Sequence, residues 1–478
     1  MLLSEGVRMG ATGVVILLLT RVFLTPSQYG LLFLAMSVLG VALLVSFPFS
    51  KSGARFLSQY RETDPSQVPH ILSWTFRYNL VGIAGVGVLL LVLAGPIASL
   101  FGEPALEPLL VVGVVYVAAK TLSSYASIAF QGLNRIRLSA FTSAISNASL
   151  LVFVVVFLLA GLGVFGAFLG YVAAPLLSAA VGLAILYVGW YRRAHRSAPV
   201  EAGLAGRILR YSVPLTGTRV AHTLDTRVDI IMVGAFLNPA SVGFYTLAKQ
   251  VVDFVTAPAT SIGFTVSPAY GEHVASGDRE RAARLFEATL TNALLLYLPA
   301  SVGIVLVARP AVRYVFGPAY LGTAPVLQVF GAFVLLRAVG KLMHDSLDYI
   351  GRARIRAATE LGSALANVVL NLLLIPTMGA AGAALATVIT FGALVAVELV
   401  VVGQEFPLDV GHLVRFTASV AAVTAVMAAV VVWLVSYVTG LLSLVAVVAL
   451  GGGVWLVLTV ATGLLGGKQL RFVTGSGN

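Results

Sequence analysis

The sequence predicts an all-α polytopic membrane protein of about fourteen transmembrane helices, built as a duplicated six-helix lobe followed by two accessory helices. Three observations predict this fold class. Of the 478 residues, 59% are hydrophobic and only 10% are charged, whereas a soluble globular chain carries about 25% charged residues. Apolar runs of about 20 residues, each long enough to cross ~30 Å of hydrocarbon, recur along the chain. Segments in the two halves of the chain also repeat one another.

The apolar runs define the expected helices in order along the chain. The first run has no small-residue cleavage site, so we interpret it as a retained span rather than a signal peptide. The polar connections are too short to hold a soluble domain. The expected spans are residues 4–24, 30–49, 78–101, 108–130, 139–160, 164–190, 211–236, 241–267, 287–307, 321–344, 357–376, 380–402, 416–438 and 442–465.

Lysine and arginine are distributed unevenly between the connections. Of the thirty basic residues, twenty fall in alternate connections, whereas the other connections contain only Arg309 and Arg313. By the positive-inside rule, the basic connections are cytoplasmic. We therefore expect a multi-pass protein of a prokaryotic plasma membrane with both termini in the cytoplasm. Loop charge near lipid headgroups also accounts for the net charge of +11, and we expect no nucleic-acid partner.

The repeat is clearest at one short corner. FLTPSQYGLLFLA at 23–35 and FLNPASVGFYTLA at 236–248 share six of thirteen positions without a gap. GVFGAFLGYV at 163–172 resembles GAAGAALATV at 379–388, and Arg-Ile-Arg at 135–137 resembles Arg-Ile-Arg at 354–356. Six spans separate the copies, so both have the same orientation, as in transporters built from two rocking lobes.

This repeat predicts the domain organisation. The expected parts are an N-lobe at 1–190, a cytoplasmic basic linker at 191–210, a C-lobe at 211–402, and two accessory helices with a short cytoplasmic tail at 403–478. The last two spans contain no charged residue between Arg415 and Lys468, so we expect them to face lipid.

Basic residues inside the spans are the main functional signal. Each costs roughly 2.5–3.5 kcal/mol at a helix centre, so such residues usually face a hydrated cavity or a partner. Snorkelling to headgroups is the alternative for Arg8 and Arg21, which lie near helix ends. The eight span cations are Arg8, Arg21, Lys120, Arg219, Arg227, Lys249, Arg337 and Lys341.

The spacing of these residues predicts polar stripes on the fourth, seventh, eighth and tenth helices that line one cavity. His222, Asp225 and Asp229 fall on one face of the seventh helix, close to Arg219. Lys120 and Lys341 occupy similar places in the two halves. Internal salt bridges, such as Lys249–Asp253 or Arg227–Asp229, are the structural alternative.

The span cations outnumber the span carboxylates. Five acids lie clearly inside spans, namely Asp225, Asp229, Asp253, Glu360 and Glu398. The positive surplus favours an anionic substrate, above all a phosphate, which arginine binds with two parallel hydrogen bonds. We therefore take Arg21, Lys120, Arg219, Lys249, Arg337 and Lys341 as candidate substrate-binding residues. His222, Asp225, Asp229 and Asp253 are candidates for coupling to H⁺ or Na⁺.

Three motifs resemble one known family. LLLTRVFLTPSQYGLLFLA in the first hairpin resembles the aR-x-Lgp-x-x-yG signature of the polysaccharide-biosynthesis flippases, the Wzx-type members of the multidrug/oligosaccharidyl-lipid/polysaccharide superfamily. DTRVDIIMVGAFLNPASVGFYTLAKQVVDF resembles the family pattern at Asp229, Gly234, Gly243, Tyr245 and Ala248. QGLNRIRLSAF at 131–141 is similar to the family's cytoplasmic loop before its fifth helix.

The resemblance implies a two-lobed, V-shaped transporter that moves a lipid-linked oligosaccharide from the cytoplasmic to the outer leaflet by alternating access. It implies a polyprenyl or dolichyl phosphate or pyrophosphate carrier, membrane lipid as the surrounding partner, and glycosyltransferases and a polymerase as functional neighbours. Arg21 matches the family's first-helix arginine, and Asp229 its seventh-helix aspartate. We expect no catalytic residue, cofactor or metal, and the absence of cysteine excludes thiolate sites.

Two other functions remain open. A MATE-type multidrug or metabolite antiporter coupled to H⁺ or Na⁺ belongs to the same superfamily, although that branch usually has twelve helices and acidic sites. A membrane glycosyltransferase or glycan polymerase usually has a sizeable outer loop. Here the longest expected outer loop offers only Glu103 and Glu107 as acids.

Overall fold

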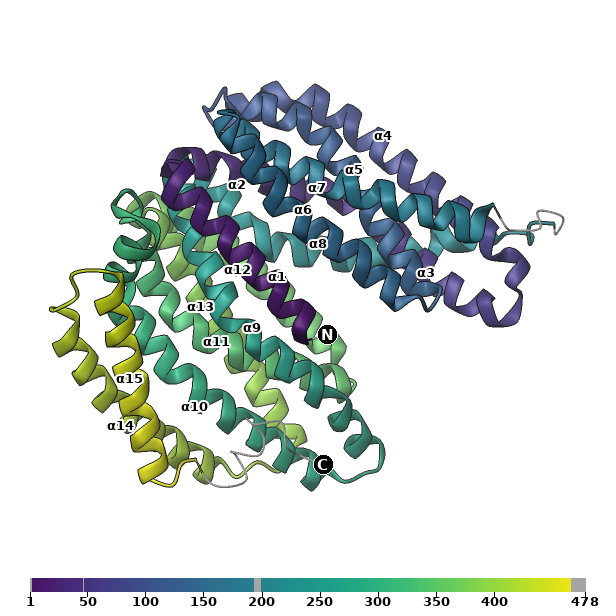
Figure 1. The fold of residues 1–478 in the computed structure, drawn as a ribbon. Coiled ribbons are helices and arrows are strands. Elements are labelled where there is room, and N and C mark those ends of the chain that lie inside the picture. The colour runs from purple at the N-terminus through teal and green to yellow at the C-terminus, as the bar shows by residue number, and fades with distance from the viewer. Residues whose placement is uncertain (1, 46, 193–198, 466–478) are drawn as a thin grey trace. The chain divides into compact units, whose positions relative to one another are not determined.

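The computed structural model describes residues 2–45, 47–192 and 199–465, and these residues are almost entirely helical and form no β-strand (Figure 1). In this part of the chain, ten helices are long and apolar enough to cross a membrane, and Met9–Phe23 and Pro26–Ala42 are two shorter apolar helices. The helices α8 (Leu204–Phe236) and α9 (Pro239–Ala275) have 33 and 37 residues, more than the ~20 that a span needs. The fold is therefore the predicted polytopic all-α fold, with room for fourteen spans.

The chain forms two compact units, unit 1 at Met1–Gly243 and unit 2 at Phe244–Asn478, with the boundary inside α9. The other helices of unit 1 are α1 (Leu2–Leu18), α2 (Pro26–Ala42), α3 (Phe47–Thr63), α4 (Val68–Leu100), α5 (Leu106–Gly132), α6 (Ile136–Leu159) and α7 (Gly163–Leu186). Those of unit 2 are α10 (Arg279–Ala311), α11 (Thr323–Tyr349), α12 (Ala353–Met378), α13 (Ala380–Glu405), α14 (Val410–Val435) and α15 (Leu441–Ala461). The lobe and linker boundaries expected from the sequence stay a prediction.

The repeated Pro–Gly corner brings two helix starts into contact. Pro26 and Pro239 are the first residues of α2 and α9, a position where proline loses no helical hydrogen bond. A Cβ added to Gly30 would lie 1.7 Å from the carbonyl oxygen of Pro239, and one added to Gly243 would lie 2.4 Å from that of Pro26. The two glycines are therefore needed for a close approach of backbone to backbone.

Helix lengths fix the register of the repeat. The helices α4 and α10 both have 33 residues, and α5 and α11 both have 27. Each of the latter two is followed by a residue with positive φ, Asn134 and Gly351. Arg135 and Arg352 then cap α6 and α12. The expected match of Arg135 with Arg354 is thus wrong by two residues, because arginines recur at every second position of 352–356.

Helix α3 is an element that the apolar runs did not predict. Residues 51–77 were expected to be a connection, but α3 covers Phe47–Thr63 and α4 begins at Val68. The helix is amphipathic and basic, so its average polarity hides it from a search for apolar runs. Its buried Leu57 and Tyr60 pack in a core cluster with Ile71 and Phe130 of α4 and α5.

Residues 199–201, in the described part of the basic linker that follows the gap, form hydrogen bonds beside this cluster. Gln67 donates to the carbonyl of Pro199 at 3.0 Å, and its own side-chain oxygen accepts from the backbone N–H of Glu201 at 3.0 Å. The Glu201 carboxylate accepts from the hydroxyl of Tyr60 and pairs with Arg207 at 2.6 Å. These two partners lower the pKa of Glu201 from its ordinary value. Within unit 1, the described end of the linker is therefore held by an ordered polar contact.

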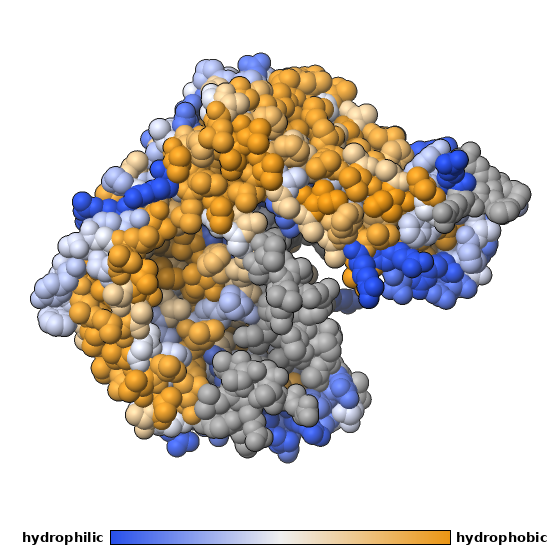
Figure 2. Space-filling view, in the orientation of Figure 1, coloured by the Kyte–Doolittle hydropathy of each residue, from blue (hydrophilic) through white to orange (hydrophobic). Residues whose placement is uncertain are grey.

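The surface of the units is largely apolar. Figure 2 shows an almost continuous hydrophobic face over α4, whereas hydrophilic residues gather near α3. Val81 on α4 is 71% exposed and Leu442 on α15 is 87% exposed. Exposed apolar area of this extent suits contact with lipid, as expected for the accessory helices α14 and α15.

Candidate functional site

The structure places seven of the ten candidate residues. The side chains of Arg219, His222 and Asp225, together with that of Arg8, lie outside the described residues. In unit 1, Arg21 lies in a short π-helical turn, Leu19–Phe23, and its side chain is exposed. Asp229 is buried in α8, with 2% of its surface exposed.

Two other cations of unit 1 come from α5 and α8. Lys120 is exposed on α5, and Arg227 is half-buried on α8. A Cβ added to Gly40 of α2 would lie 3.1 Å from Nε of Arg227, and Arg227 interacts electrostatically with Tyr116, one turn before Lys120 on α5. Among the described residues, no carboxylate forms an ion pair with Arg21, Lys120 or Arg227.

The placed cations of unit 2 have a different environment. Arg337 on α11 pairs with Asp253 on α9, and Lys341 pairs with Asp345 one turn along α11. Lys249 on α9 is half-buried, with Nζ 6.0 Å from the centre of the Tyr245 ring. Two of the three cations predicted to hold substrate in this unit are therefore already compensated by carboxylates.

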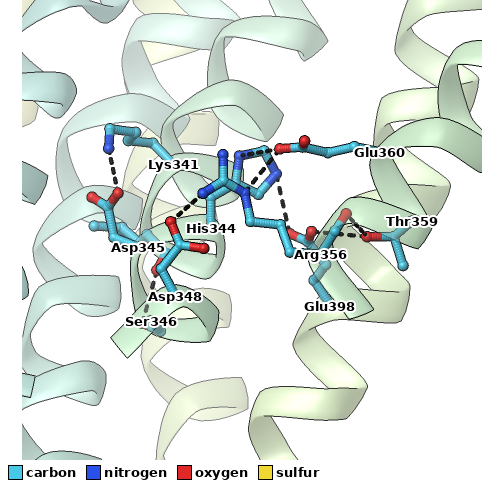
Figure 3. Close-up of polar contacts among 10 residues, drawn as sticks. Lys341, His344, Asp345, Ser346, Asp348, Arg356, Thr359, Glu360 and Glu398 are labelled. Carbon is cyan, nitrogen blue, oxygen red and sulfur yellow. Dashed lines mark hydrogen bonds and ion pairs between the residues drawn. The ribbon is translucent and has the colours of Figure 1, made fainter. Parts of the chain in front are cut away.

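The polar residues of α11, α12 and α13 form one network around His344 (Figure 3). Nε2 of His344 lies 3.2 Å from Oε2 of Glu398, and Nδ1 lies 3.7 Å from Oε1 of Glu360. Glu398 on α13 is fully buried, and its other oxygen accepts from Thr359 of α12 at 3.1 Å. One histidine thus lies between two carboxylates from two other helices.

Arg356 completes the network at the start of α12. Its Nε donates to Glu360 at 2.9 Å, and its NH1 donates to Asp348 of α11. The network and the adjoining Lys341–Asp345 pair contain four carboxylates and two permanent cations. This part of unit 2 is acidic, so the positive surplus expected from the sequence does not hold here.

Sequence reasoning noticed the parts of this network but not the site. It counted Glu360 and Glu398 only as span acids, and it treated Lys341 as a substrate ligand. The sequence did contain a signal. Glu398 has no cation one turn away in its own apolar span, and Glu360 has only Arg356, at the start of α12. Such an acid needs a partner from another helix.

The repeat register shows how the two units differ. Lys120 and Arg337 both lie fourteen residues after the start of their 27-residue helices, so Lys120 matches Arg337 rather than Lys341. Gly40 and Asp253 both lie fourteen residues after the start of α2 and α9. The carboxylate that neutralises Arg337 in unit 2 is therefore replaced by glycine in unit 1.

The same register relates the His344 network to neutral residues of unit 1. Asp348 matches Gln131, and Arg356 matches Ser139. The contact is kept, because Nε2 of Gln131 donates to the Ser139 hydroxyl at 3.1 Å.

The histidine and the buried glutamate of the network also have neutral counterparts. His344 matches Ser127, whose hydroxyl lies 2.8 Å from that of Ser139. Gly163, the first residue of α7, and Gly379, which precedes α13, both have positive φ, and their match aligns Glu398 with Gly182. Unit 1 thus joins equivalent helices through uncharged groups.

Comparison with known families agrees with the resemblance of the first hairpin. The family model described as "Polysaccharide biosynthesis protein" matches residues 1–272, and the model described as "MatE" matches residues 214–377. The probable low-salt glycan biosynthesis flippase Agl15 of Haloferax volcanii is 25% identical over 164 residues, which are 34% of this chain and 35% of that protein. The succinoglycan biosynthesis transport protein ExoT of Rhizobium meliloti is 24% identical over 330 residues, 68% of this chain and 63% of that protein.

Solved structures show the same fold. The lipid II flippase MurJ in an inward closed conformation has a TM-score of 0.77 and 17% identity, with 97% of both chains covered. An inward-facing MATE transporter of the MOP superfamily has a TM-score of 0.70 and 13% identity, with 86% of this chain and 96% of that chain covered. At these identities the likeness concerns the fold alone.

Proposed function

The chain belongs to the polysaccharide biosynthesis protein family, and we propose that it flips an anionic lipid-linked oligosaccharide from the cytoplasmic to the outer leaflet of a prokaryotic plasma membrane. The family match supports this activity, as do the names of two relatives, a glycan biosynthesis flippase and a succinoglycan transport protein. The matched segments span about a third and 63% of those relatives. The protein acts as a transporter, without covalent catalysis.

One observation carries the proposal about the substrate. In unit 2, Arg337 is neutralised by Asp253, whereas in unit 1 glycine stands at the position that matches Asp253, and the matching cation Lys120 has no carboxylate partner among the described residues. Arg227 packs at Gly40. Arg227 beside this glycine and Lys120 at the matching register position give the membrane-spanning unit room and charge for an anion. A phosphate suits both, because arginine binds it with a bidentate fork and lysine as a point charge.

The depth of the cations suggests a path for the phosphate. Gly40 and Lys120 lie fourteen residues from the outer ends of α2 and α5 in the predicted orientation, which is about 21 Å along each axis. Arg21 lies at the outer end of the first span. In our proposal the phosphate is held first near Lys120 and Arg227 and later near Arg21, while the lipid tail stays in the membrane and the two repeats rock.

The remaining candidate cations differ in their surroundings. Arg337 and Lys341 are compensated in this conformation, and their contact with substrate stays a prediction. Arg219 and Lys249 also stay predictions as phosphate ligands. In our proposal both termini lie in the cytoplasm, as the distribution of basic residues predicts.

The test places a carboxylate at the glycine. Gly40→Asp adds to unit 1 the charge that Asp253 supplies in unit 2, and Gly40→Asn adds nearly the same volume without charge. We expect Gly40→Asp to slow the flipping of a fluorescent polyprenyl-diphosphate-linked sugar in proteoliposomes by at least about tenfold, roughly 1.4 kcal/mol. Gly40→Asn controls for the displacement of Arg227 by a side chain at position 40. Equal rates for the two folded variants would contradict the phosphate site.

A cation-coupled antiporter is the second candidate, because the MatE model matches residues 214–377 and the His344 network is acidic. It predicts efflux of a cationic dye by the purified protein in proteoliposomes, with loss of efflux in Glu398→Gln. Flipping of the lipid-linked sugar without dye efflux would exclude it.

A further inference from the structure

We propose that His344, Glu360 and Glu398 form a proton-binding site whose occupancy holds α11, α12 and α13 together. The proton site stands on the geometry of unit 2 alone. Its coupling to flipping rests on the proposed function, and the experiments below separate the two.

The first argument is the arrangement of donors and acceptors. Both ring nitrogens of His344 face a carboxylate oxygen, at 3.2 Å for Glu398 and 3.7 Å for Glu360. A neutral imidazole has one N–H and one acceptor nitrogen, whereas an imidazolium has two N–H groups. Only the protonated ring can therefore donate toward both carboxylates. His344 is positioned to bind a proton between two helices that its own helix contacts.

The second argument is the burial of Glu398. Its side chain is fully buried, and Oε2, which faces His344, accepts no hydrogen bond from any described residue. A buried carboxylate without a compensating charge is costly. A proton on His344 supplies that charge at 3.2 Å, and its loss leaves Glu398, among the described residues, with only the longer-range attraction of Arg356.

The third argument is the charge of the surroundings. Arg356 is engaged by Glu360 and Asp348, and Lys341 is engaged by Asp345. Neither of these permanent cations forms an ion pair with Glu398, although Arg356 interacts with it electrostatically at longer range. With His344 neutral, the two cations face four carboxylates, so an added proton lowers the local negative charge.

The neighbouring helices add few ionisable groups. Tyr270 of α9 interacts with Asp345, and Tyr297 is the ionisable residue that α10 places beside Ala338 and Leu342 of α11. From α13, the ring of Phe391 lies 6.2 Å from that of His344. Among the described residues these contacts bring no further permanent charge to the imidazole.

The fourth argument comes from the repeat. Ser127, Gln131 and Ser139 of unit 1 join the matching helices through neutral hydrogen bonds. Packing of these helices therefore does not require ionisable residues. Histidine and buried glutamate in unit 2 add the ability to titrate, and imidazole is the side chain that changes charge between about pH 5 and 8.

These arguments give the site a role in the transport cycle. With the proton bound, α11 is linked to α12 and α13 by charge-assisted contacts. After the proton is released, hydration stabilises the Glu398 carboxylate. Water can reach this carboxylate only if the three helices separate. Proton binding therefore favours the arrangement in which α11, α12 and α13 are packed together. By reciprocal linkage, this packed arrangement binds the proton more tightly than the separated one.

The first experiment measures thermal unfolding of the purified protein in detergent between about pH 6 and 8. A proton bound more tightly in the folded state stabilises at low pH and is lost as pH rises, so we expect the Tm of the wild type to fall across this window. His344→Gln and Glu398→Gln should flatten that slope, and the second variant keeps a group that can bond Thr359. His412→Gln, an exposed histidine on α14, is the matched control. Equal slopes in all four proteins would overturn the proton site.

The second experiment measures coupling in proteoliposomes with the same fluorescent polyprenyl-diphosphate-linked sugar. The wild-type flipping rate should change with pH, up to about tenfold per unit for one proton, and the rate of His344→Gln should not. Retained pH dependence in His344→Gln, or dependence on Na⁺ instead of pH, would overturn the coupling. A wild-type protein that shows the Tm slope but does not flip the sugar would refute the proposed function and support the proton site.

Discussion

Equivalent positions in the two units of this protein have the same backbone and opposite charge balance. Unit 2 places Asp253 opposite Arg337, whereas unit 1 has Gly40 and Lys120 at the matching positions of helices of the same register. Since a cation inside a membrane needs compensation, unit 2 supplies it from its own residues, and we propose that a ligand supplies it in unit 1. The duplication kept the frame while the polar residues diverged.

A second pair of positions differs in the reverse sense. Around the start of α6, unit 1 uses a serine and glutamine network, whereas unit 2 uses His344, Arg356 and three carboxylates at the start of α12. Unit 1 therefore has neutral side chains where unit 2 has ionisable ones, and, among the described residues, an unpaired cation where unit 2 has an ion pair. The contrast assigns anion binding to unit 1 and proton binding to unit 2 as the two proposals to be tested.

The largest effect should come from breaking the frame that the copies share. Gly30→Ala puts a methyl group 1.7 Å from the backbone oxygen of Pro239, and backbone cannot move aside as a flexible side chain can. Overpacking usually costs about 1–3 kcal/mol, and we expect this variant to reach at least the upper end and to yield little folded protein. Gly85→Ala on α4, where nothing lies within 4 Å, is the control. The measurement is the Tm and the monodisperse yield in detergent, and similar values for both variants would show that the corner is not in contact.

An intermediate effect should come from making unit 2 resemble unit 1. Asp253→Asn leaves Arg337 without its carboxylate. Because the two side chains are 39% and 50% exposed, we expect a loss of only about 1 kcal/mol or less in unfolding free energy. Lys120→Met should cause no such loss, since Lys120 forms no ion pair with a described residue. Denaturant unfolding of both variants measures the difference, and an equal loss from Lys120→Met would mean that unit 1 also compensates its cation internally.

The frame was predictable from sequence because it depends on local patterns. Apolar runs predicted the spans. The spacing of Pro26 and Gly30 predicted a tight corner, which recurs at Pro239 and Gly243. Helix α3 was missed because a basic amphipathic helix has no apolar run. Charge counting predicted a surplus of cations over all the spans, which the acidic surroundings of His344 in unit 2 do not share. For unit 1 the surplus stays a prediction.

The His344 network illustrates why the rest of the site was out of reach. His344, Glu360 and Glu398 come from three helices, and no spacing along the chain relates them. Their meeting depends on how α11, α12 and α13 pack. The matching network of Ser127 and Ser139 contains no charged residue, so the repeat gave no hint of it either.

The smallest effect tests whether unit 1 also pairs charges where water is available. Glu201 accepts from the hydroxyl of Tyr60 and pairs with Arg207 outside the spans, and these partners lower the pKa of Glu201. A carboxyl with a lowered pKa in the folded state stabilises above its ordinary range, near pH 4.5, and loses that contribution as pH falls. We therefore expect the Tm of the wild type to drop below that of neutral solution between about pH 5 and 4, and Glu201→Gln to remove this part of the drop. Glu62→Gln, which changes an exposed carboxylate whose partner Arg61 adjoins it in sequence, is the control. If Glu201→Gln and Glu62→Gln follow the wild-type curve alike, the linker contact contributes nothing. Unit 1 would then gain no measurable stability from its charge pair outside the spans, in addition to having cations inside them that form no ion pair with a described residue.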